Sequence, residues 1–171
     1  MSNAHIRALH QLDSELSEGT VSFSDADRFA CSRDLWPKHL IRLNEGLPSV
    51  LPLAVIQPRT TEEVQHIVIR CRQAGIALVP YGAGSSVVGG ATVEEGQVVI
   101  DFKRMNASVR VDADSMVVWA QAGVMGELLE RQVNRVGFTQ GHFPSSIYCT
   151  SVGGWIAARS AGQMSSRFGK I

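Results

Sequence analysis

Two glycine- and serine-rich segments carry the residue types that bind phosphate and other anions. The first runs from Pro80 to Gly90 and the second from Gly141 to Gly162. Successive backbone N–H groups and serine hydroxyls in such a loop can line a concavity that holds a phosphate group. The first segment therefore predicts a phosphate site, built from its backbone and from the hydroxyls of Ser85 and Ser86; the alternative is a tight surface turn.

Two better-known phosphate loops do not match the first segment. The Rossmann fingerprint G-x-G-x-x-G fits Gly82 and Gly84, but Val87 stands at its third glycine, and the loop follows the second strand of its unit. A Walker loop needs Lys and then Ser or Thr after its last glycine, where this chain has Gly90 and Ala91. What remains is a non-helical loop at the end of a strand.

The second segment contains a hydroxyl-capped helix start. Thr150 and Ser151 precede the sequence VGGW, which predicts a short helix from Gly153 to Ser160 with Trp155 anchored in the core. A helix N-terminus attracts anions, and glycine there permits a ligand to approach closely. The alternative is a glycine-rich packing contact between secondary-structure elements.

A β-α-β unit positions the first loop. Leu53–Ile56 is a short apolar run that predicts a strand, and Thr60 with Glu63 forms a capping box for the helix that follows. Gly75 suits the position after the end of that helix, and Ile76–Val79 predicts a second strand. The second strand leads directly into the phosphate-binding candidate.

Hydrophobic periodicity predicts the remaining elements less completely. The segment 20–52 is expected to be mostly irregular. The other expected elements are a helix over 4–18, a short helix near 24–31, a strand over 98–102, a hairpin of 109–112 with 116–122, and a helix over 126–135.

Composition excludes several classes of protein. Lys plus Arg and Asp plus Glu are both 16, so nothing favours a nucleic-acid partner. No apolar run is long enough to span a membrane. The three cysteines, Cys31, Cys71 and Cys149, form no metal-binding spacing, so we expect no metal and mostly buried, reduced thiols.

The two segments together resemble the FAD-linked oxidases of the vanillyl-alcohol oxidase and p-cresol methylhydroxylase type. Pro80–Ser86 is similar to their pyrophosphate loop, Ala54–Val64 to the start of their FAD-binding domain, and Ser151–Gly162 to a second flavin-contacting segment. Gly141-His142-x-Pro144, and the Trp after the paired glycines, are most similar to the alkyldihydroxyacetone-phosphate synthase branch. D-lactate and glycolate dehydrogenases are further relatives in this family.

The resemblance implies an α+β fold, a two-subdomain p-cresol methylhydroxylase-type FAD-binding domain preceded by an N-terminal helical segment. Residues 1–52 would form that segment, and 53–171 the FAD-binding domain without its C-terminal part and substrate-cap domain. FAD would bind non-covalently, because the first loop has no histidine and His142 lies outside the usual attachment context. The resemblance assigns FAD contacts to Pro80, Tyr81, Gly82, Ala83, Gly84, Ser85, Ser86, Ser145, Ser146, Ile147, Tyr148, Cys149, Thr150, Ser151, Ala158, Arg159, Ser160 and Ala161.

By the same resemblance, the parent protein is expected to be a flavoenzyme with a small-molecule substrate, and a homodimer formed through regions beyond this chain. The reduced cysteines imply a cytoplasmic location. We expect it to exchange an acyl for an alkyl chain on dihydroxyacetone phosphate. The alternatives are an FAD-dependent D-lactate or glycolate dehydrogenase and a non-catalytic nucleotide-binding fragment. The acid–base residues of this family lie mainly beyond the region present here, so no catalytic residue is assigned.

Individual side chains in and near the two segments have separate expectations. Tyr81 is expected to pack under the first loop, and His142 to be a solvated loop residue. Arg159 is balanced between an ion pair and contact with a phosphate or carboxylate. Cys149 is expected to be an inert thiol, and Trp119 a core or subdomain-interface residue.

Overall fold

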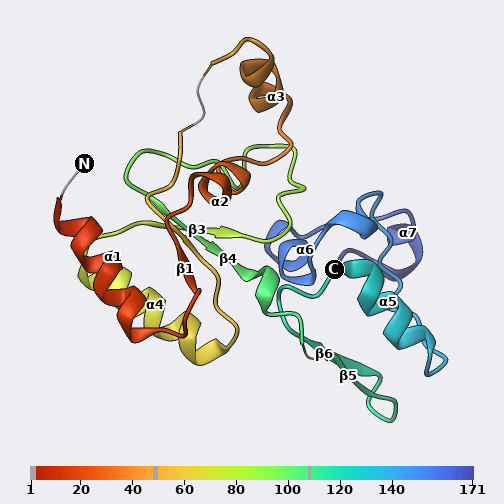
Figure 1. Cartoon of the computed structure of the whole chain (residues 1–171). Coiled ribbons are helices and arrows are strands. Elements are labelled where there is room, and N and C mark those ends of the chain that lie inside the picture. Colours follow the sequence, from red (N-terminus) through yellow and green to blue (C-terminus); the bar gives the residue numbers. More distant parts are fainter. Residues whose placement is uncertain (1–2, 48–49, 108) are drawn as a thin grey trace. The chain divides into compact units, whose positions relative to one another are not determined.

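The computed structural model describes residues 3–47, 50–107 and 109–171. The chain divides into two compact units, Met1–Phe102 (unit 1) and Lys103–Ile171 (unit 2), each with its own helices, strands and core (Figure 1). The first glycine loop belongs to unit 1 and the second segment to unit 2. In the described ranges, no helix combines the length and the apolar character needed to cross a membrane.

Unit 1 is built on a four-stranded sheet. Its strand order is β1 (Val21–Ser22), β2 (Val55–Ile56), β4 (Val98–Asp101) and β3 (Leu78–Tyr81). Strands β2 and β3 both pair with β4 in parallel, whereas β1 pairs with β2 antiparallel. All four residues of β4 are buried, which suits the continuous apolar run of a central parallel strand.

Helices cover the sheet of unit 1. Helix α1 (Asn3–Glu15) and helix α4 (Thr61–Gln73) lie side by side in Figure 1, and both contribute buried residues to the larger core cluster. That cluster joins Leu9 and Leu12 of α1 to Ile67 and Cys71 of α4. Helix α1 therefore packs into the same core as α4.

The cap of α4 follows the sequence expectation closely. The hydroxyl of Thr60 accepts a hydrogen bond from the N–H of Glu63 at 3.2 Å. The carboxylate of Glu63 accepts from the N–H of Arg59 at 2.6 Å, one residue before the usual partner in a capping box. Gly75 follows the helix with φ +67°, the left-handed conformation that favours glycine.

The described residues of unit 2, 103–107 and 109–171, form a hairpin and three α-helices. Strands β5 (Val109–Asp112) and β6 (Val117–Ala120) pair antiparallel, and the carboxylate of Asp112 accepts from two N–H groups of the turn. The hairpin is followed by α5 (Gly126–Asn134), α6 (Val152–Ala158) and α7 (Ser165–Phe168). The core of this unit consists of Val124, Leu129, Val133, Val152 and Trp155.

The segment 20–52 differs most from its expectation. It was expected to be mostly irregular apart from a short helix near 24–31. It contains α2 (Asp25–Ala30), but also β1 and a further helix, α3 (Pro37–Asn44). Pro37 occupies the first turn of α3, where its missing N–H removes no helical hydrogen bond, so this proline starts a helix and does not interrupt one.

Candidate FAD-binding site

The first glycine loop lies at the carboxyl end of a parallel strand. It begins directly after Tyr81, the last residue of β3, and the chain returns to the sheet at Val98 of β4. Because β3 and β4 are parallel neighbours, the loop lies outside the carboxyl edge of the sheet. Ligands of open α/β sheets characteristically bind at this edge.

Tyr81 lies under the loop, as expected from the sequence. Its side chain is buried, and its hydroxyl donates toward the carbonyl oxygens of Arg33 at 3.1 Å and Ala30 at 3.3 Å. Burial raises the pKa of Tyr81 to about 12, so the phenol stays neutral. The ring therefore supports the loop from below.

The backbone of the loop presents hydrogen-bond donors with no protein acceptor. Among the described residues, no acceptor lies within hydrogen-bonding range of the N–H groups of Gly84, Ser85 or Ser86. The Ser86 hydroxyl accepts weakly from the N–H groups of Val88 and Gly90, both at 3.4 Å. Three consecutive free donors in a loop containing a left-handed glycine match the type of backbone concavity that binds anions.

Residues of the N-terminal segment hold this loop in place. The carbonyl oxygen of Ser86 accepts from the N–H of Leu35 at 2.9 Å. Trp36 packs against Gly89 so closely that a Cβ on this glycine would lie 2.9 Å from the indole ring. Sequence reasoning missed this support, because Leu35 and Trp36 lie about fifty positions before the residues that they touch and belong to no periodic element.

The second segment contains a short, partly exposed stretch over residues 145–149. Ser145 is exposed, and a 3₁₀ turn, η2 (Ile147–Cys149), follows it. Tyr148 is 78% exposed and Cys149 is also exposed, so the expectation that the cysteines are mostly buried holds for Cys31 and Cys71 but not for Cys149. The exposed side chains of this stretch are available to a ligand.

The N-terminus of α6 has a structural role. Ser151 caps the helix as expected, accepting from the N–H of Gly154 at 3.3 Å. The N–H groups of Val152 and Gly153 donate to carbonyl oxygens in the chain just before α5, at 2.9 and 2.8 Å. The expectation that this N-terminus attracts an anion is therefore wrong: its first donors are already used by protein acceptors.

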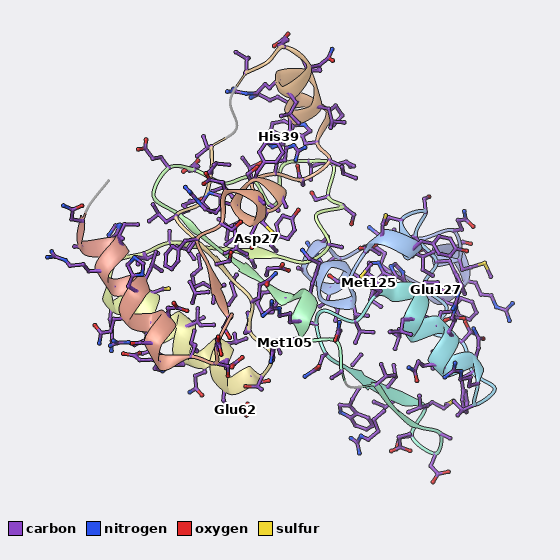
Figure 2. The ribbon with its side chains drawn as sticks, in the orientation of Figure 1. Asp27, His39, Glu62, Met105, Met125 and Glu127 are labelled. Carbon is purple, nitrogen blue, oxygen red and sulfur yellow. The ribbon has the colours of Figure 1, made fainter. Side chains whose placement is uncertain are left out.

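Gly153, the first of the two adjacent glycines in α6, packs against Ala122. A Cβ on Gly153 would lie 2.8 Å from the Cβ of Ala122 and 2.9 Å from its carbonyl oxygen, so no larger residue fits there. This is the packing contact that the sequence left open as an alternative. Figure 2 labels Met125, which forms an isolated antiparallel bridge with Ser151 and so joins the cap of α6 to the start of α5.

Residues 158–161 form the C-terminal end of α6 and the turn that follows it. Arg159 ends the helix with φ +46°, and the N–H of Ser160 donates to the carbonyl oxygen of Trp155 at 2.9 Å. Ala158, Arg159 and Ala161 are exposed, whereas Ser160 is half-buried. Among the described residues, no carboxylate forms an ion pair with Arg159. Contact of this side chain with a ligand stays a prediction.

His142 is not the solvated loop residue that the sequence suggested. It is 4% exposed and contacts Trp155 edge-on, with ring centroids 4.8 Å apart. Burial lowers the pKa of His142, so the imidazole is held neutral. Trp119 is not a core residue, since it is 44% exposed and the guanidinium of Arg110 lies 3.8 Å from the centre of its ring. The other expectation for Trp119, a place at the subdomain interface, stays a prediction.

Two further residues of unit 2 fix the segment and were missed from sequence. A Cβ on Gly126 would lie 2.0 Å from the indole of Trp155, so α5 and α6 approach closely at this point. Buried Glu130 accepts from Thr139 at 2.7 Å and from the N–H of Gln140 at 3.1 Å, which ties α5 to the chain before His142. The sequence did not indicate that Glu130 is buried, because the only sign of its burial is its position on the apolar face of an amphipathic helix.

Unit 2 also contains a mainly apolar cavity of about 440 Å³. It is lined by the hairpin, by α5 and by two residues of α6, Val152 and Ile156. None of the predicted contacts in 145–151 or 158–161 lines it. The cavity and the exposed stretch around Tyr148 are therefore separate features of this unit.

Comparison with known proteins shows which family the chain belongs to. An FAD-binding domain family matches residues 52–171 of the chain. The chain belongs to this family of FAD-binding domains. The domain is 32% identical over 162 residues to an alkyldihydroxyacetonephosphate synthase of Caenorhabditis elegans, a match that covers 91% of this chain and 27% of that protein. A D-lactate dehydrogenase of Anaerostipes hadrus is 30% identical over a shorter stretch of 118 residues, or 69% of this chain and 25% of that protein.

Solved structures agree on the fold. The FAD-binding domain superposes on an alkyldihydroxyacetonephosphate synthase with a TM-score of 0.90 and 28% identity, over 97% of this chain and 31% of that one. A p-cresol methylhydroxylase matches with a TM-score of 0.64 over 80% of this chain and 25% of that one, at 18% identity. The expected α+β fold of p-cresol methylhydroxylase type is confirmed. The chain spans about a third or less of the length of these relatives.

FAD is the cofactor of this family, and the first loop fits it. The free N–H groups of Gly84, Ser85 and Ser86 are donors of the kind that a pyrophosphate requires. A bound flavin would supply the electron-transfer chemistry, which no protein side chain provides. The described residues would bind and orient the cofactor.

Proposed function

We propose that the first loop binds the FAD pyrophosphate and that the exposed parts of the second segment contact the flavin. The predicted contacts are those assigned from the sequence, Pro80–Ser86, Ser145–Ser151 and Ala158–Ala161. The observation that carries the proposal is the row of three unpartnered N–H groups at Gly84, Ser85 and Ser86. In this proposal FAD is held without a covalent bond, as expected from the sequence, in which the first loop contains no histidine.

Denaturation of the FAD-loaded chain tests the mode of attachment. The chain is incubated with FAD, freed of excess cofactor and precipitated with acid. Non-covalent binding predicts that all of the yellow absorbance appears in the supernatant. Flavin that stays with the precipitated protein would contradict this part of the proposal.

For the parent protein we propose an alkyldihydroxyacetone-phosphate synthase-like activity, in which the acyl chain of acyl-dihydroxyacetone phosphate is exchanged for an alkyl chain. The similarity over 91% of this chain supports it. The residues that decide the reaction are outside the predicted contacts, and no catalytic residue is assigned. The same proposal includes three further expectations from the sequence. They are a cytoplasmic location, a homodimer and a domain boundary near residue 53.

A D-2-hydroxy-acid dehydrogenase is the second candidate, favoured by the shorter similarity to a D-lactate dehydrogenase. Two assays on the FAD-loaded parent protein separate the candidates. Exchange of a labelled fatty alcohol onto acyl-dihydroxyacetone phosphate, with no bleaching of the flavin by D-lactate or glycolate under anaerobic conditions, supports the synthase. Bleaching without exchange supports the dehydrogenase and overturns the first choice.

A further inference from the structure

A small cavity in unit 1 is surrounded by positive charge. Its volume is about 190 Å³, and the residues that define its chemistry are Arg33, Trp36, Lys38, His39, Arg42 and Thr92. They come from the turn after α2, from α3 and from the chain that leads into β4. His39 on α3 is labelled in Figure 2. None of the predicted FAD contacts in 80–86 lines this cavity.

The cations around the cavity have no carboxylate partners. In the described part of the chain, none of Arg33, Lys38 and Arg42 forms an ion pair. The Nε of Arg33 is buried and has no hydrogen-bond partner. A buried donor without a partner is costly, and an anion in the cavity would satisfy the Nε of Arg33. Lys38 and Arg42 are exposed, so solvent screens their charges, but both could turn toward a bound anion.

One carboxylate, that of Asp34, contacts residues that line the cavity through its Oδ1, whereas its Oδ2 is buried and has no hydrogen-bond partner among the described residues. Asp34 is fully buried, and its Oδ1 accepts from the N–H of Trp36 at 3.1 Å and lies 3.7 Å from the Nε2 of His39. Arg33, Lys38 and Arg42 bring three positive charges to the cavity, against the single carboxylate of Asp34. Asp34 therefore organises the wall of the cavity and leaves its excess of positive charge in place.

The wall is held by several contacts. The Nε2 of His39 is hydrogen-bonded to the hydroxyl of Thr92 at 2.9 Å, and its ring meets Trp36 edge-on. The Nζ of Lys38 lies 5.1 Å from the centre of the Trp36 ring. The cavity is smaller than the roughly 300–1,000 Å³ that is typical of sites for drug-sized ligands, which favours a compact anion.

We propose that this cavity binds the phosphate group of a small phosphorylated ligand other than FAD. The unpaired guanidinium and ammonium groups supply the charge, and the indole of Trp36 supplies an apolar wall for the carbon atoms next to the phosphate. The proposal does not depend on FAD binding by the first loop. If the chain failed to bind FAD, phosphate binding by this cavity could still be tested in the same way.

Fluorine NMR on the 171-residue chain labelled with 5-fluorotryptophan tests the proposal, with inorganic phosphate as the probe. The chain has three tryptophans, so single Trp→Phe variants assign the resonances. Phosphate is added at constant ionic strength. We expect a saturable shift of the Trp36 resonance, while the Trp119 and Trp155 resonances stay in place and report an intact fold.

Charge-removal variants make the test specific. The double substitution Lys38→Gln/Arg42→Gln removes two of the cations, and we expect it to weaken phosphate binding about tenfold or more. Arg72→Gln, which removes an exposed cation from α4, is the matched control and should leave binding unchanged. The single substitution Arg42→Gln should give an intermediate loss.

Three results would overturn the proposal. The first is a Trp36 resonance that does not shift, or that shifts without saturating. The second is equal binding by the double variant and by Arg72→Gln, which would mean a general salt effect. The third is loss of the phosphate-induced shift when FAD saturates the chain, because the cavity would then belong to the FAD site.

Discussion

The hydroxyl oxygen of Tyr81 occupies the space beside Gly84: a Cβ on this glycine would lie only 2.1 Å from it. Gly84 also has φ +70°, which side chains rarely adopt. The close approach links the buried end of β3 to the row of free N–H groups above it. The shape of the loop therefore depends on a glycine at this position and on the tyrosine below it.

Gly84→Ala should reduce FAD binding by the chain at least about tenfold, because the loop must move to make room for the methyl group. Gly75→Ala is the matched control. Gly75 has φ +67°, so alanine meets the same backbone strain there, but its Cβ would have nothing within 4 Å. Equilibrium dialysis with FAD gives both affinities. Equal affinities for the two variants would show that the contact with Tyr81 does not shape the site.

Tyr81→Phe should destabilise unit 1 by about 1 kcal/mol, the net value of a typical neutral hydrogen bond. The substitution removes the hydroxyl that bonds to the carbonyls of Arg33 and Ala30 and keeps the ring that packs under the loop. Urea denaturation measures the loss. FAD affinity should change by less than about threefold, since the hydroxyl donates to the carbonyls of Arg33 and Ala30 and the ring under the loop is kept. A loss as large as that of Gly84→Ala would assign the hydroxyl itself to the FAD contact.

The relation between sequence and structure is clearest in α4 and its flanks. Thr60, Glu63 and Gly75 carry local signals, because capping and helix termination depend on neighbours in the chain. The paired strands and the loop after β3 follow from apolar runs bounded by glycine and proline. The segment 20–52 was misjudged because Pro37 can either interrupt or start a helix, and its neighbours do not decide between the two.

In the candidate site, too, features that depend on neighbours in the chain could be predicted, and contacts between distant residues could not. The first loop, the Ser151 cap and the packing of Tyr81 could be predicted, since each depends on a short stretch of chain. The burial of His142 and the contact of Gly126 with Trp155 could not, because they join residues 13 and 29 positions apart without a repeating pattern. The support of Ser86 by Leu35 is of the same kind.

Gly126→Ala should destabilise unit 2 by about 1–3 kcal/mol, the usual cost of overpacking a core. The new Cβ would lie 2.0 Å from the Cζ2 of Trp155, and helix backbone fixes its position. Thermal unfolding of the variant measures the loss. Trp155→Phe in the same chain removes the atoms that clash, so the double variant should lose less than the sum of the single losses. Strict additivity would contradict the proposed clash.

The stability of unit 2 should fall as the pH is lowered through about 6.5, the ordinary pKa of histidine. Burial lowers the pKa of His142 in the folded state, so the unfolded chain binds more protons in this range and acid favours unfolding. Near-UV circular dichroism during thermal unfolding, at pH values above and below this range, follows the change. His142→Gln should remove the part of the pH dependence that this residue causes. An unchanged pH dependence in the variant would refute the assignment.

Amide NMR of the ¹⁵N-labelled chain during titration with FAD tests the central claim most directly. The account predicts that the N–H resonances of Gly84, Ser85 and Ser86 shift with FAD and also with ADP, which carries the same pyrophosphate. Resonances of 145–151 and 158–161 should shift with FAD but much less with ADP. Binding of FAD that left the resonances of Gly84, Ser85 and Ser86 unchanged would contradict the account.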